Sequence, residues 1–300
     1  MEKDLVSIII PTYNRAKDLN RSLRSIRNQT YKNLQVIVVD NSSVDETDEV
    51  VDSFSDLRIS IYKIQNQGVI AVSRNLGIQK AEGEFVAFLD ADDWWAARKL
   101  EESVRNLKEK KMDFVYHDLY KVYSNDQKFF RKKERTRNLV FPVLRDLIVN
   151  GNAINNSSVV LRKSVIDSVG LLDENPEIVA GEDYDYWMRI AKVTDKFYRI
   201  PKTLGFYWIG GGNISNPKRT LNVIEAIKKK YQSEFERLIP GEDKTPLWFH
   251  KSKILVYLSL GEFENAKQEV AKLKNAPVKT KWKYFVLFYI KNFLHSILNR

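Results

Sequence analysis

Apolar runs alternate with amphipathic stretches four times in the first 95 residues, and this alternation restricts the fold more than any other feature of the sequence. Four apolar runs have the length and composition of buried parallel strands: LVSIII at 5–10, LQVIVVD at 34–40, RISIYKI at 58–64 and FVAFL at 85–89. The stretches between them predict helices at 15–29, 41–54 and 69–83. Strands and helices that alternate in this way predict an α/β protein with a doubly wound sheet.

The pattern is less regular after residue 95 and mainly helical after about residue 218. A charged helix is expected at 99–111 and a strand at 112–124, and 157–170 passes from a strand into a short helix. The segment 181–193 predicts an amphipathic helix with an acidic first turn, which the helix dipole favours. We therefore expect a domain boundary near residue 218.

Composition narrows the kinds of function. The 300 residues are enough to bury a sizeable core, and the absence of cysteine excludes disulfides, thiolate metal sites and cysteine nucleophiles. The three histidines are scattered along the chain, which argues against a histidine-rich metal site. The apolar run before Pro11 is too short for a signal peptide, so export is not expected. The net charge of +10 permits nucleic acid, an anionic membrane or a phosphorylated substrate as partner.

Polar side chains follow three of the predicted strands. Pro11-Thr12-Tyr13-Asn14 follows the first, Asp40-Asn41 ends the second, and Asp90-Ala91-Asp92-Asp93 follows the fourth. Because parallel neighbours present their carboxyl ends at one edge, these residues can converge on one crevice. Carboxylates this close repel one another unless a cation lies between them or one keeps its proton, and a divalent ion with oxygen ligands would stabilise them. A solvated junction between strand and loop is the alternative.

The common phosphate-binding signatures are missing from the sequence. It contains neither GxGxxG nor GxxxxGK followed by Ser or Thr. Asp40 and Asn41 can hydrogen-bond a base or a ribose, and Tyr13 offers a ring for stacking. A nucleotide bound here would need a metal to neutralise its diphosphate, and carboxylates such as those of the fourth strand could hold that metal.

Four stretches together resemble the family 2 glycosyltransferases of the GT-A fold, in order and at familiar spacings. They are 6–47 with PTYNR and VVDNSS, 66–93 with NQGVIAVSRN and FLDADD, GLLDE at 170–174 and GEDYDYWMR at 181–189. The likeness covers roughly residues 5–215. It implies the GT-A nucleotide-diphospho-sugar transferase fold, a Rossmann-like, mostly parallel sheet flanked by helices, with a helical C-terminal extension.

The resemblance, the change to a helical pattern near residue 218 and the composition of the last residues together predict a division of the chain. The GT-A catalytic domain would cover 1–217, with a nucleotide-sugar half at about 1–95 and an acceptor half at about 96–217. A helical C-terminal region would cover 218–300, with a membrane-surface tail at 278–300.

The resemblance implies roles for particular residues. Those expected to bind the nucleotide are Pro11, Thr12, Tyr13, Asp40, Asn41, Asn66, Gly68, Arg74 and Asn75. Asp90 and Asp92 match the DxD signature: Asp92 would coordinate Mg²⁺ or Mn²⁺ on the diphosphate, and Asp90 would face the ribose or the sugar. In GEDYDYW, Asp183 matches the general base and Glu182 its acidic neighbour.

The implied activity is that of a metal-dependent, inverting glycosyltransferase. An acceptor hydroxyl attacks the anomeric carbon in one displacement, a carboxylate takes its proton, and a divalent cation stabilises the departing nucleoside diphosphate. A UDP-sugar is the favoured donor, and a saccharide or lipid-linked saccharide in bacterial surface-polysaccharide assembly is the acceptor. Trp94, Tyr186 and Trp187 could stack on that acceptor, with burial in the core as the alternative for the last two.

The resemblance places the enzyme in the cytoplasm, as a peripheral protein at the inner face of the plasma membrane, and leaves the oligomeric state open. Residues 247–277 resemble one tetratricopeptide-type helical hairpin, which cannot bury its own apolar face alone. The basic, aromatic segment 281–300 is too short and too interrupted to span a bilayer comfortably. It could lie on an anionic membrane surface, and docking of this helix into the protein core is the alternative.

Two other functions fit parts of the sequence. FLDADD is similar to the nucleophile motif of haloacid-dehalogenase-like phosphatases, in which Asp90 would be phosphorylated, but that motif usually lies near the N-terminus. The net charge fits a basic nucleic-acid-binding protein, but the basic cluster at 128–137 offers only Phe129 and Phe130 for base stacking. The combined motifs favour the glycosyltransferase and no nucleic-acid partner.

Overall fold

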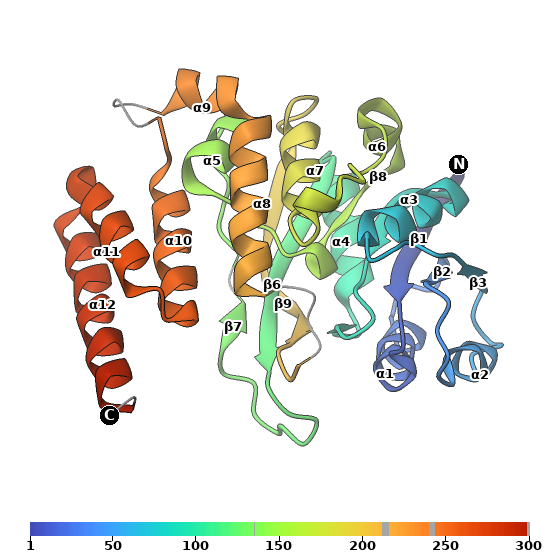
Figure 1. The fold of residues 1–300 in the computed structure, drawn as a ribbon. Coiled ribbons are helices and arrows are strands. Elements are labelled where there is room, and N and C mark those ends of the chain that lie inside the picture. The colour runs from blue at the N-terminus through green and yellow to red at the C-terminus, as the bar shows by residue number, and fades with distance from the viewer. Residues whose placement is uncertain (135, 212–215, 240–243, 299–300) are drawn as a thin grey trace. The chain divides into compact units, whose positions relative to one another are not determined.

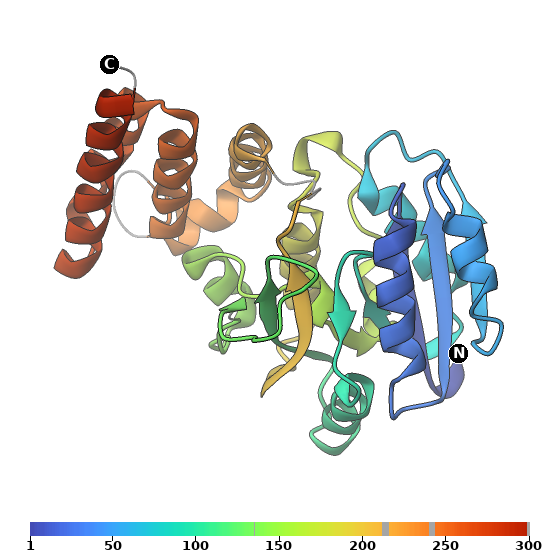
Figure 2. The same ribbon diagram turned by 90° about the horizontal axis from the view of Figure 1, so that it is seen from below.

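The computed structural model of the chain describes residues 1–134, 136–211, 216–239 and 244–298, without the side chains of 274, 275 and 292–298. It divides into two compact units, shown in two views in Figures 1 and 2. The first consists of residues 1–143, 153–176 and 182–212, and the second of residues 144–152, 177–181 and 213–300. The expected division of 1–217 into a nucleotide-sugar half and an acceptor half stays a prediction.

Four parallel strands form the first half of the sheet in the first unit. β1 (Glu2–Thr12) pairs with β2 (Leu34–Asp40) on one side and with β4 (Gly83–Phe88) on the other, and β3 (Ile59–Lys63) pairs with β2. β2 is buried along its whole length, as expected for an unbroken apolar strand inside a parallel sheet. All four strands predicted from the apolar runs are confirmed.

The sheet continues beyond β4 into a mixed half. β8 (Val160–Arg162) is antiparallel to β4 and to β6 (Phe114–Val122), while β6 is parallel to β9 (Phe197–Trp208). Two short strands, β7 (Lys133–Glu134) and β5 (Trp94–Trp95), pair antiparallel with β6 and β9. Among the described residues the strand order is β3-β2-β1-β4-β8-β6-β9-β5, with β7 beside β6. This is the mostly parallel sheet expected from the sequence.

Successive residues of β1 pack toward different helices, because side chains alternate between the faces of a strand. Ile8 and Ile10 share a buried core with Leu19 of α1 (Ala16–Arg27) and Val51 of α2 (Thr47–Asp52). Ile9 instead meets Gly77 of α3 (Ile70–Lys80), where an added Cβ would lie 2.4 Å from Ile9 Cγ2. Helices therefore cover both faces of the parallel strands (Figure 1).

The other helical segments of this part of the chain are α4 (Lys99–Glu109), η1 (Asn156–Ser158), α6 (Lys163–Val169), η2 (Pro176–Ile178) and α7 (Glu182–Ala191). α2 is shorter than the helix predicted at 41–54. The Asp45 carboxylate accepts hydrogen bonds from the Ala16 N–H (2.9 Å) and from the Thr47 hydroxyl (2.6 Å). Asp45 is thus tied to the start of α1, while Ser42 has φ +58° and the Ser43 N–H is held by the Asp40 carboxylate. These residues form a turn, so the helix begins only at Thr47.

The helices of the C-terminal region confirm the hairpin predicted at 247–277. The described helical segments there are α8 (Pro217–Lys230), α9 (Gln232–Leu238), α10 (Leu247–Leu260), α11 (Phe263–Ala271), η3 (Lys272–Asn275) and α12 (Val278–Leu298). α5 (Val143–Asn150) comes from the middle of the chain and belongs mostly to the same unit. Gly261 joins α10 to α11 with φ +74°, a conformation that favours glycine. The apolar face of the hairpin is covered by Tyr284 and Phe288 of α12.

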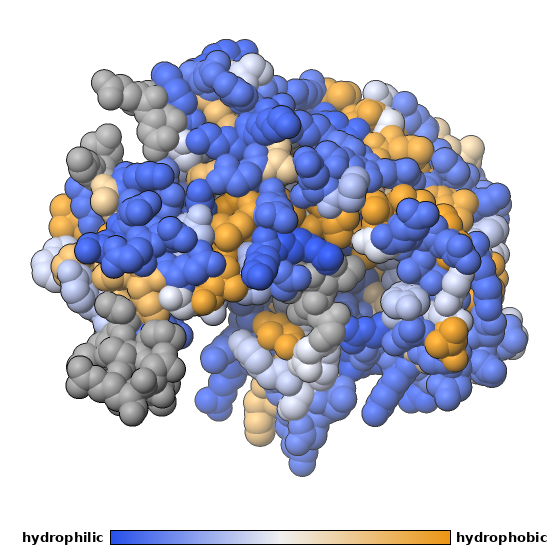
Figure 3. Space-filling model, in the orientation of Figure 1, coloured by the Kyte–Doolittle hydropathy of each residue, from blue (hydrophilic) through white to orange (hydrophobic). Residues whose placement is uncertain are grey.

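The surface is largely hydrophilic on the face shown in Figure 3, where hydrophobic residues form separate patches. Within the described ranges, no helix combines the length and the apolar content needed to cross a membrane. Arg135 of the basic cluster at 128–137 and Arg300 of the segment 281–300 lie outside the described residues.

Candidate active site

The carboxyl ends of β1 and β2 bring the first two polar motifs together. Thr12 and Asp40 are register partners in the parallel pair, and the Asn41 N–H donates to the Thr12 carbonyl oxygen at 2.9 Å. The polar residues 90–93 follow β4, which pairs with β1 on the side opposite β2. Three neighbouring parallel strands therefore bring these polar motifs to one edge of the sheet, and the crevice expected there stays a prediction.

The Asp40 carboxylate organises the turn after β2. It is fully buried and accepts hydrogen bonds from the Ser43 hydroxyl (2.5 Å) and the Ser43 N–H (3.1 Å). Asn14, with φ +49°, ties this turn to the end of β1, since its N–H donates to Ser43 Oγ (2.8 Å) and its Oδ1 accepts from the Val44 N–H (2.9 Å). The two loops are therefore held as one preorganised surface.

Two side chains of this surface are suited to a ligand. The Tyr13 side chain is 57% exposed, although it lies beside a buried strand. The Thr12 hydroxyl is buried, and it has no hydrogen-bond partner among the described residues. A stacking ring next to an unsatisfied buried hydroxyl matches the needs of a planar polar group such as a nucleotide base.

The predicted residues of the α3 region have mainly internal partners. Asn66 donates to Ser73 Oγ (2.8 Å) and accepts from the Gly68 N–H (2.9 Å), which fixes a turn in which Gly68 has φ +81°. Asn75 donates to the Leu172 carbonyl oxygen (2.9 Å) and accepts from the Leu172 N–H (2.8 Å). These two amides shape the loops, and a direct contact from either to a nucleotide stays a prediction.

Arg74 joins the two acidic motifs. Its guanidinium is buried, donates to Asp90 Oδ1 at 2.7 Å, and forms an ion pair with Glu182 in the first turn of α7. Asn156 also donates to Asp90 Oδ1, at 3.0 Å. The guanidinium has five N–H donors in a planar fork, so one arginine can fix the orientation of both carboxylates. The DxD and GED motifs thus meet at one point of the structure.

Asp92 lies in a strained electrostatic setting. Burial and the charge of Asp90 raise its pKa to about 6, although Arg15 opposes that shift. Its carbonyl oxygen accepts a hydrogen bond from Arg21 at 2.8 Å, and the Arg21 guanidinium lies over the Trp94 ring at 4.2 Å. The backbone of the DxD loop is therefore fixed while the Asp92 carboxylate stays close to another negative charge.

Asp93, the third carboxylate of the loop, has a different environment. It is 1% exposed, and its Oδ1 accepts a hydrogen bond from the Trp208 N–H at 2.9 Å. Burial, together with the charge of Asp92, raises the pKa of Asp93 well above its usual value. The side chain connects the DxD loop to β9 and is enclosed by protein.

The carboxylates can be compared with the needs of a divalent cation. Within the described ranges, no three acidic or histidine side chains converge as a complete metal site. Mg²⁺ and Mn²⁺ are often held by one or two carboxylates together with phosphate oxygens of a substrate. Asp90 and Asp92 supply such a pair. Burial is the main cause of the raised pKa of Asp92, and a cation would remove the repulsion from Asp90 that adds to it. The donor set therefore fits a metal shared with a diphosphate.

Asp183 has the properties expected of a proton acceptor. Burial raises its pKa to about 7, with a further contribution from the charge of Glu182, while Arg74 acts in the opposite direction. Its Oδ1 accepts a hydrogen bond from the Tyr184 N–H at 2.7 Å. The helix N-terminus alone would lower this pKa, so burial has the larger effect and makes the carboxylate a usable base near neutral pH.

The aromatic residues predicted to contact an acceptor differ in exposure. Tyr186 and Trp187 are 0% and 1% exposed, and Trp187 packs edge-to-face on Phe114 with ring centroids 4.9 Å apart. Both rings are therefore buried in the core, and the prediction that they stack on an acceptor is wrong. Trp94 is half-buried and stacks on Phe206 at 5.2 Å, so its ring borders the site from β5.

Several residues near the carboxylates were not identified from the sequence. Ser157 accepts a hydrogen bond from the Asp90 N–H at 3.1 Å, and Tyr207 has a raised pKa because of burial and the nearby charges of Asp93 and Asp90. Arg15 donates to the Gly211 carbonyl oxygen at 3.5 Å and lies close enough to Asp92 to affect its pKa. The polar run Asn155–Ser158 could have indicated a functional site in the sequence. No sequence pattern marks Arg15 or Tyr207 as functional residues.

Comparison with known proteins adds to this geometry. The family described as "Glycosyl transferase family 2" matches residues 7–167. An Escherichia coli protein, UDP-Glc:alpha-D-GlcNAc-diphosphoundecaprenol beta-1,3-glucosyltransferase WfgD, is 32% identical over 195 residues, which is 64% of this chain and 72% of that protein.

Two solved structures are similar in fold. S. aureus TarS in complex with UDP-GlcNAc has a TM-score of 0.60 at 17% identity, covering 88% of this chain and 90% of that one. The mannosyltransferase PcManGT from Pyrobaculum calidifontis, in complex with GDP-Man and Mn²⁺, has a TM-score of 0.56 at 18% identity, covering 96% and 86%. These likenesses confirm the sheet and helix arrangement expected from the sequence.

Proposed function

The chain belongs to glycosyl transferase family 2, and from this premise we propose that it is an inverting, metal-dependent enzyme that transfers a sugar from a nucleoside-diphosphate donor, with a UDP-sugar favoured. The observation that carries the proposal is the buried Arg74, which binds Asp90 after β4 and Glu182 at the start of α7. A donor-binding motif and a base-bearing motif, distant in sequence, are thereby held together. Neither a phosphatase nor a nucleic-acid-binding function is favoured by any comparable observation.

The donor nucleotide is proposed to bind at the ends of β1 and β2. The exposed ring of Tyr13 and the unsatisfied hydroxyl of Thr12 would receive the base, and the turn held by Asp40 would receive the ribose. Pro11, Asn41, Gly68 and the amides of Asn66 and Asn75 would shape the pocket. TarS with UDP-GlcNAc and the named donor of WfgD support UDP, whereas PcManGT holds GDP-Man.

Asp92 and Asp90 are proposed to hold Mg²⁺ or Mn²⁺ together with the donor's diphosphate. The metal, when bound, would act as a Lewis acid on the departing diphosphate. Arg74 and Asn156 both bind Oδ1 of Asp90 and so fix the plane of that carboxylate. Arg15 adds a positive charge beside Asp92, where the negative charge of the leaving group develops.

Asp183 is proposed to take the proton of the acceptor hydroxyl as that oxygen attacks the anomeric carbon from the face opposite the leaving group. A base with a pKa of about 7 is partly ionised at neutral pH and still basic enough to accept a proton. Glu182 is paired with Arg74, so its role is to position this turn of α7. The C–O bond to the acceptor forms while the C–O bond to the diphosphate breaks, which inverts the configuration.

The acceptor is proposed to be a saccharide or a lipid-linked saccharide in bacterial surface-polysaccharide assembly, at the cytoplasmic face of a membrane. The support is the printed acceptor of WfgD, a diphosphoundecaprenol-linked sugar, together with the family assignment. Trp94 is the aromatic residue best placed to border an acceptor, because Tyr186 and Trp187 are enclosed in the core.

Calorimetry would test the donor site directly. UDP, GDP, CDP and dTDP would be titrated with and without Mn²⁺ into the native protein, into Asp92→Asn and into Asp167→Asn, whose carboxylate lies on the exposed end of an ion pair in α6. We expect one nucleotide to bind preferentially, and its affinity to fall when Mn²⁺ or the Asp92 carboxylate is removed but not in Asp167→Asn. Absence of nucleotide binding under every condition would overturn the proposal.

A further inference from the structure

α12 has apolar residues on two sides, and one of these sides is not covered. Tyr284 and Phe288 point into the core of the helical region, with exposures of 7% and 6%. Trp282, Phe285 and Tyr289 follow one another at helical spacing on another side, with exposures of 63%, 45% and 53%. A helix that is covered on one side and aromatic on the exposed side has an unused apolar surface.

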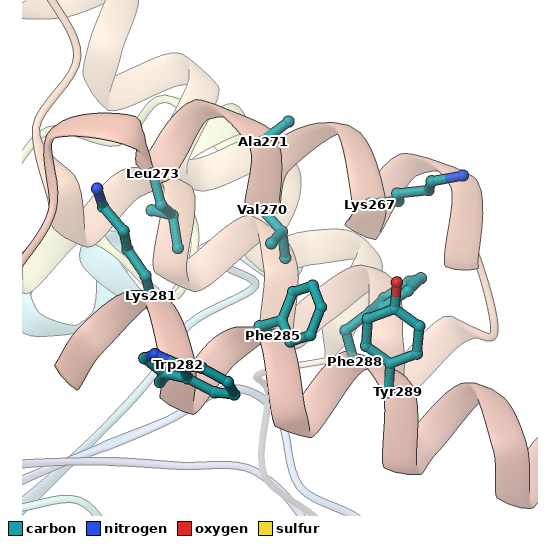
Figure 4. Close-up of a pocket in the computed structure, with 9 residues that line it drawn as sticks. All are labelled: Lys267, Val270, Ala271, Leu273, Lys281, Trp282, Phe285, Phe288 and Tyr289. Atoms are coloured by element: carbon teal, nitrogen blue, oxygen red, sulfur yellow. The ribbon is translucent and has the colours of Figure 1, made fainter. Parts of the chain in front are cut away.

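This exposed side forms a groove with α11. The groove has a volume of about 660 Å³ and is lined by Lys267, Val270, Ala271, Leu273, Lys281, Trp282, Phe285, Phe288 and Tyr289. Figure 4 shows the rings of α12 along one wall, with Lys267 and Lys281 at opposite ends of the groove. An apolar floor with an amine at each end is suited to an amphipathic, negatively charged ligand.

The sequence around the groove also favours a negatively charged partner. No Asp or Glu occurs after Glu269, whereas lysine or arginine occurs at positions 272, 274, 279, 281, 283, 291 and 300. Glu269 itself is paired with Lys272 and His250. The segment therefore carries an uncompensated positive charge beside its exposed rings.

We propose that the groove and the exposed side of α12 dock on an anionic phospholipid bilayer. Tryptophan, phenylalanine and tyrosine side chains are favourable at the boundary between headgroups and acyl chains, and flanking lysines are attracted by anionic headgroups. α12 would then lie in the plane of the interface with its Tyr284 side still packed on the hairpin. A second copy of the chain is a poorer occupant, because two equally basic faces repel each other.

The proposal goes beyond the donor chemistry, because it concerns only the helical region and needs no nucleotide. Its test is therefore separate from the test of the active site. Variants of the groove should bind UDP as the native protein does. Failure of the native protein to bind UDP would not contradict the proposed membrane-binding surface.

Cosedimentation of the full chain with lipid vesicles tests the proposal. The native protein is expected to bind vesicles of equal parts phosphatidylglycerol and phosphatidylcholine, and to bind pure phosphatidylcholine much less. The variant Trp282→Ser/Phe285→Ser/Tyr289→Ser should lose roughly tenfold or more in affinity. The matched control is Leu255→Ser, an exposed apolar residue on α10 that does not line the groove. It should bind as the native protein does.

A charge variant keeps the test independent of the rings. Lys267→Glu/Lys281→Glu should weaken binding at low salt by roughly tenfold or more, whereas Lys218→Glu/Lys229→Glu makes the same change of net charge on α8 and should weaken it less. Lys267, Lys218 and Lys229 are exposed and Lys281 is half-buried at the rim of the groove, so circular dichroism melting should stay near that of the native protein.

Three results would overturn the proposal. The first is that the native chain binds neither vesicle. The second is that the α8 charge variant loses as much affinity as the groove variant, which would mean that only net charge matters. The third is a concentration-dependent dimer in light scattering that the ring variant abolishes while vesicles stay unbound, which would show a second copy on this surface.

Discussion

The donor edge of the sheet and the groove of α12 both gather charge, but they stabilise it in different ways. At the donor edge, Arg74 and Glu182 are 3% and 4% exposed and are paired with each other. In the groove, Lys267 and Lys281 lie at the rim of an apolar wall. Buried charges must be paired at all times because desolvation is costly, whereas rim charges are free to meet a partner that arrives later. The first arrangement suits a preformed chemical site and the second suits docking.

Removing the buried cation should produce the largest effect. Arg74→Met leaves Asp90 and Glu182 without the guanidinium that pairs them, and we expect the free energy of unfolding to fall by about 3 to 5 kcal/mol. Chemical denaturation measures this change. Adding Glu182→Gln should restore part of the loss, because one of the unpaired carboxylates is then neutral.

The control for that prediction is an exposed ion-pair arginine. Arg58, whose side chain is 48% exposed, pairs with Glu2 and Glu82 at the surface, and Arg58→Met should cost less than about 1 kcal/mol. Equal losses for the two arginines would contradict the contrast between buried and exposed charge.

Neighbouring carboxylates of the DxD loop should respond differently to the same substitution. Asp92→Asn removes the proposed metal ligand, and kcat/KM should fall by roughly a hundredfold or more. Asp93→Asn should change kcat/KM by much less, because burial already favours the neutral form of Asp93 and an amide oxygen can still accept from the Trp208 N–H. Steady-state kinetics with the best donor would show whether the order is reversed.

The sequence predicts the parts of this site better than their partners. Periodicity and apolar runs are local signals, so β2 was predicted with its observed bounds and α3 to within a few residues. The partner of Arg74 is not a local property: Glu182 lies 108 residues away. A resemblance could therefore indicate a nucleotide contact for Arg74, but only the fold reveals its buried ion pairs.

The aromatic residues of α7 and α12 also show that burial depends on contacts that the local sequence does not reveal. Both helices carry aromatic runs, and in the sequence each run fits either a ligand surface or a core. In α7, Tyr186 and Trp187 are enclosed, since the helix is buried on most of its faces. In α12, Tyr284 is enclosed while Trp282 is exposed. Helical spacing assigns residues to faces, and packing alone decides which faces are covered.

The pH dependence of the reaction should follow Asp183. Because burial raises its pKa to about 7, protonation below that pH removes the base, and kcat/KM should fall toward a slope of about tenfold per pH unit down to about pH 6, where Asp92 begins to take up a proton as well. Above about pH 8 the profile should be flat with respect to this group. Asp183→Asn should lower activity and abolish this limb, and an unchanged limb in that variant would assign the titration to another carboxylate.

The smallest expected effect concerns the joint of the helical hairpin. Gly261 has φ +74°, a conformation that costs any residue with a Cβ about 1 kcal/mol, so Gly261→Ala should lower the free energy of unfolding of the helical region by about that amount. Gly77→Ala in α3 provides the comparison at the sheet, because its Cβ would lie 2.4 Å from Ile9 Cγ2 and force the helix away from β1. Hydrogen exchange of α10 and α11 against β1 and β2 would separate the two changes. If Gly261→Ala also loosened β1, the two units would unfold together, and the contrast between a rigid chemical edge and a separately stabilised docking region would need revision.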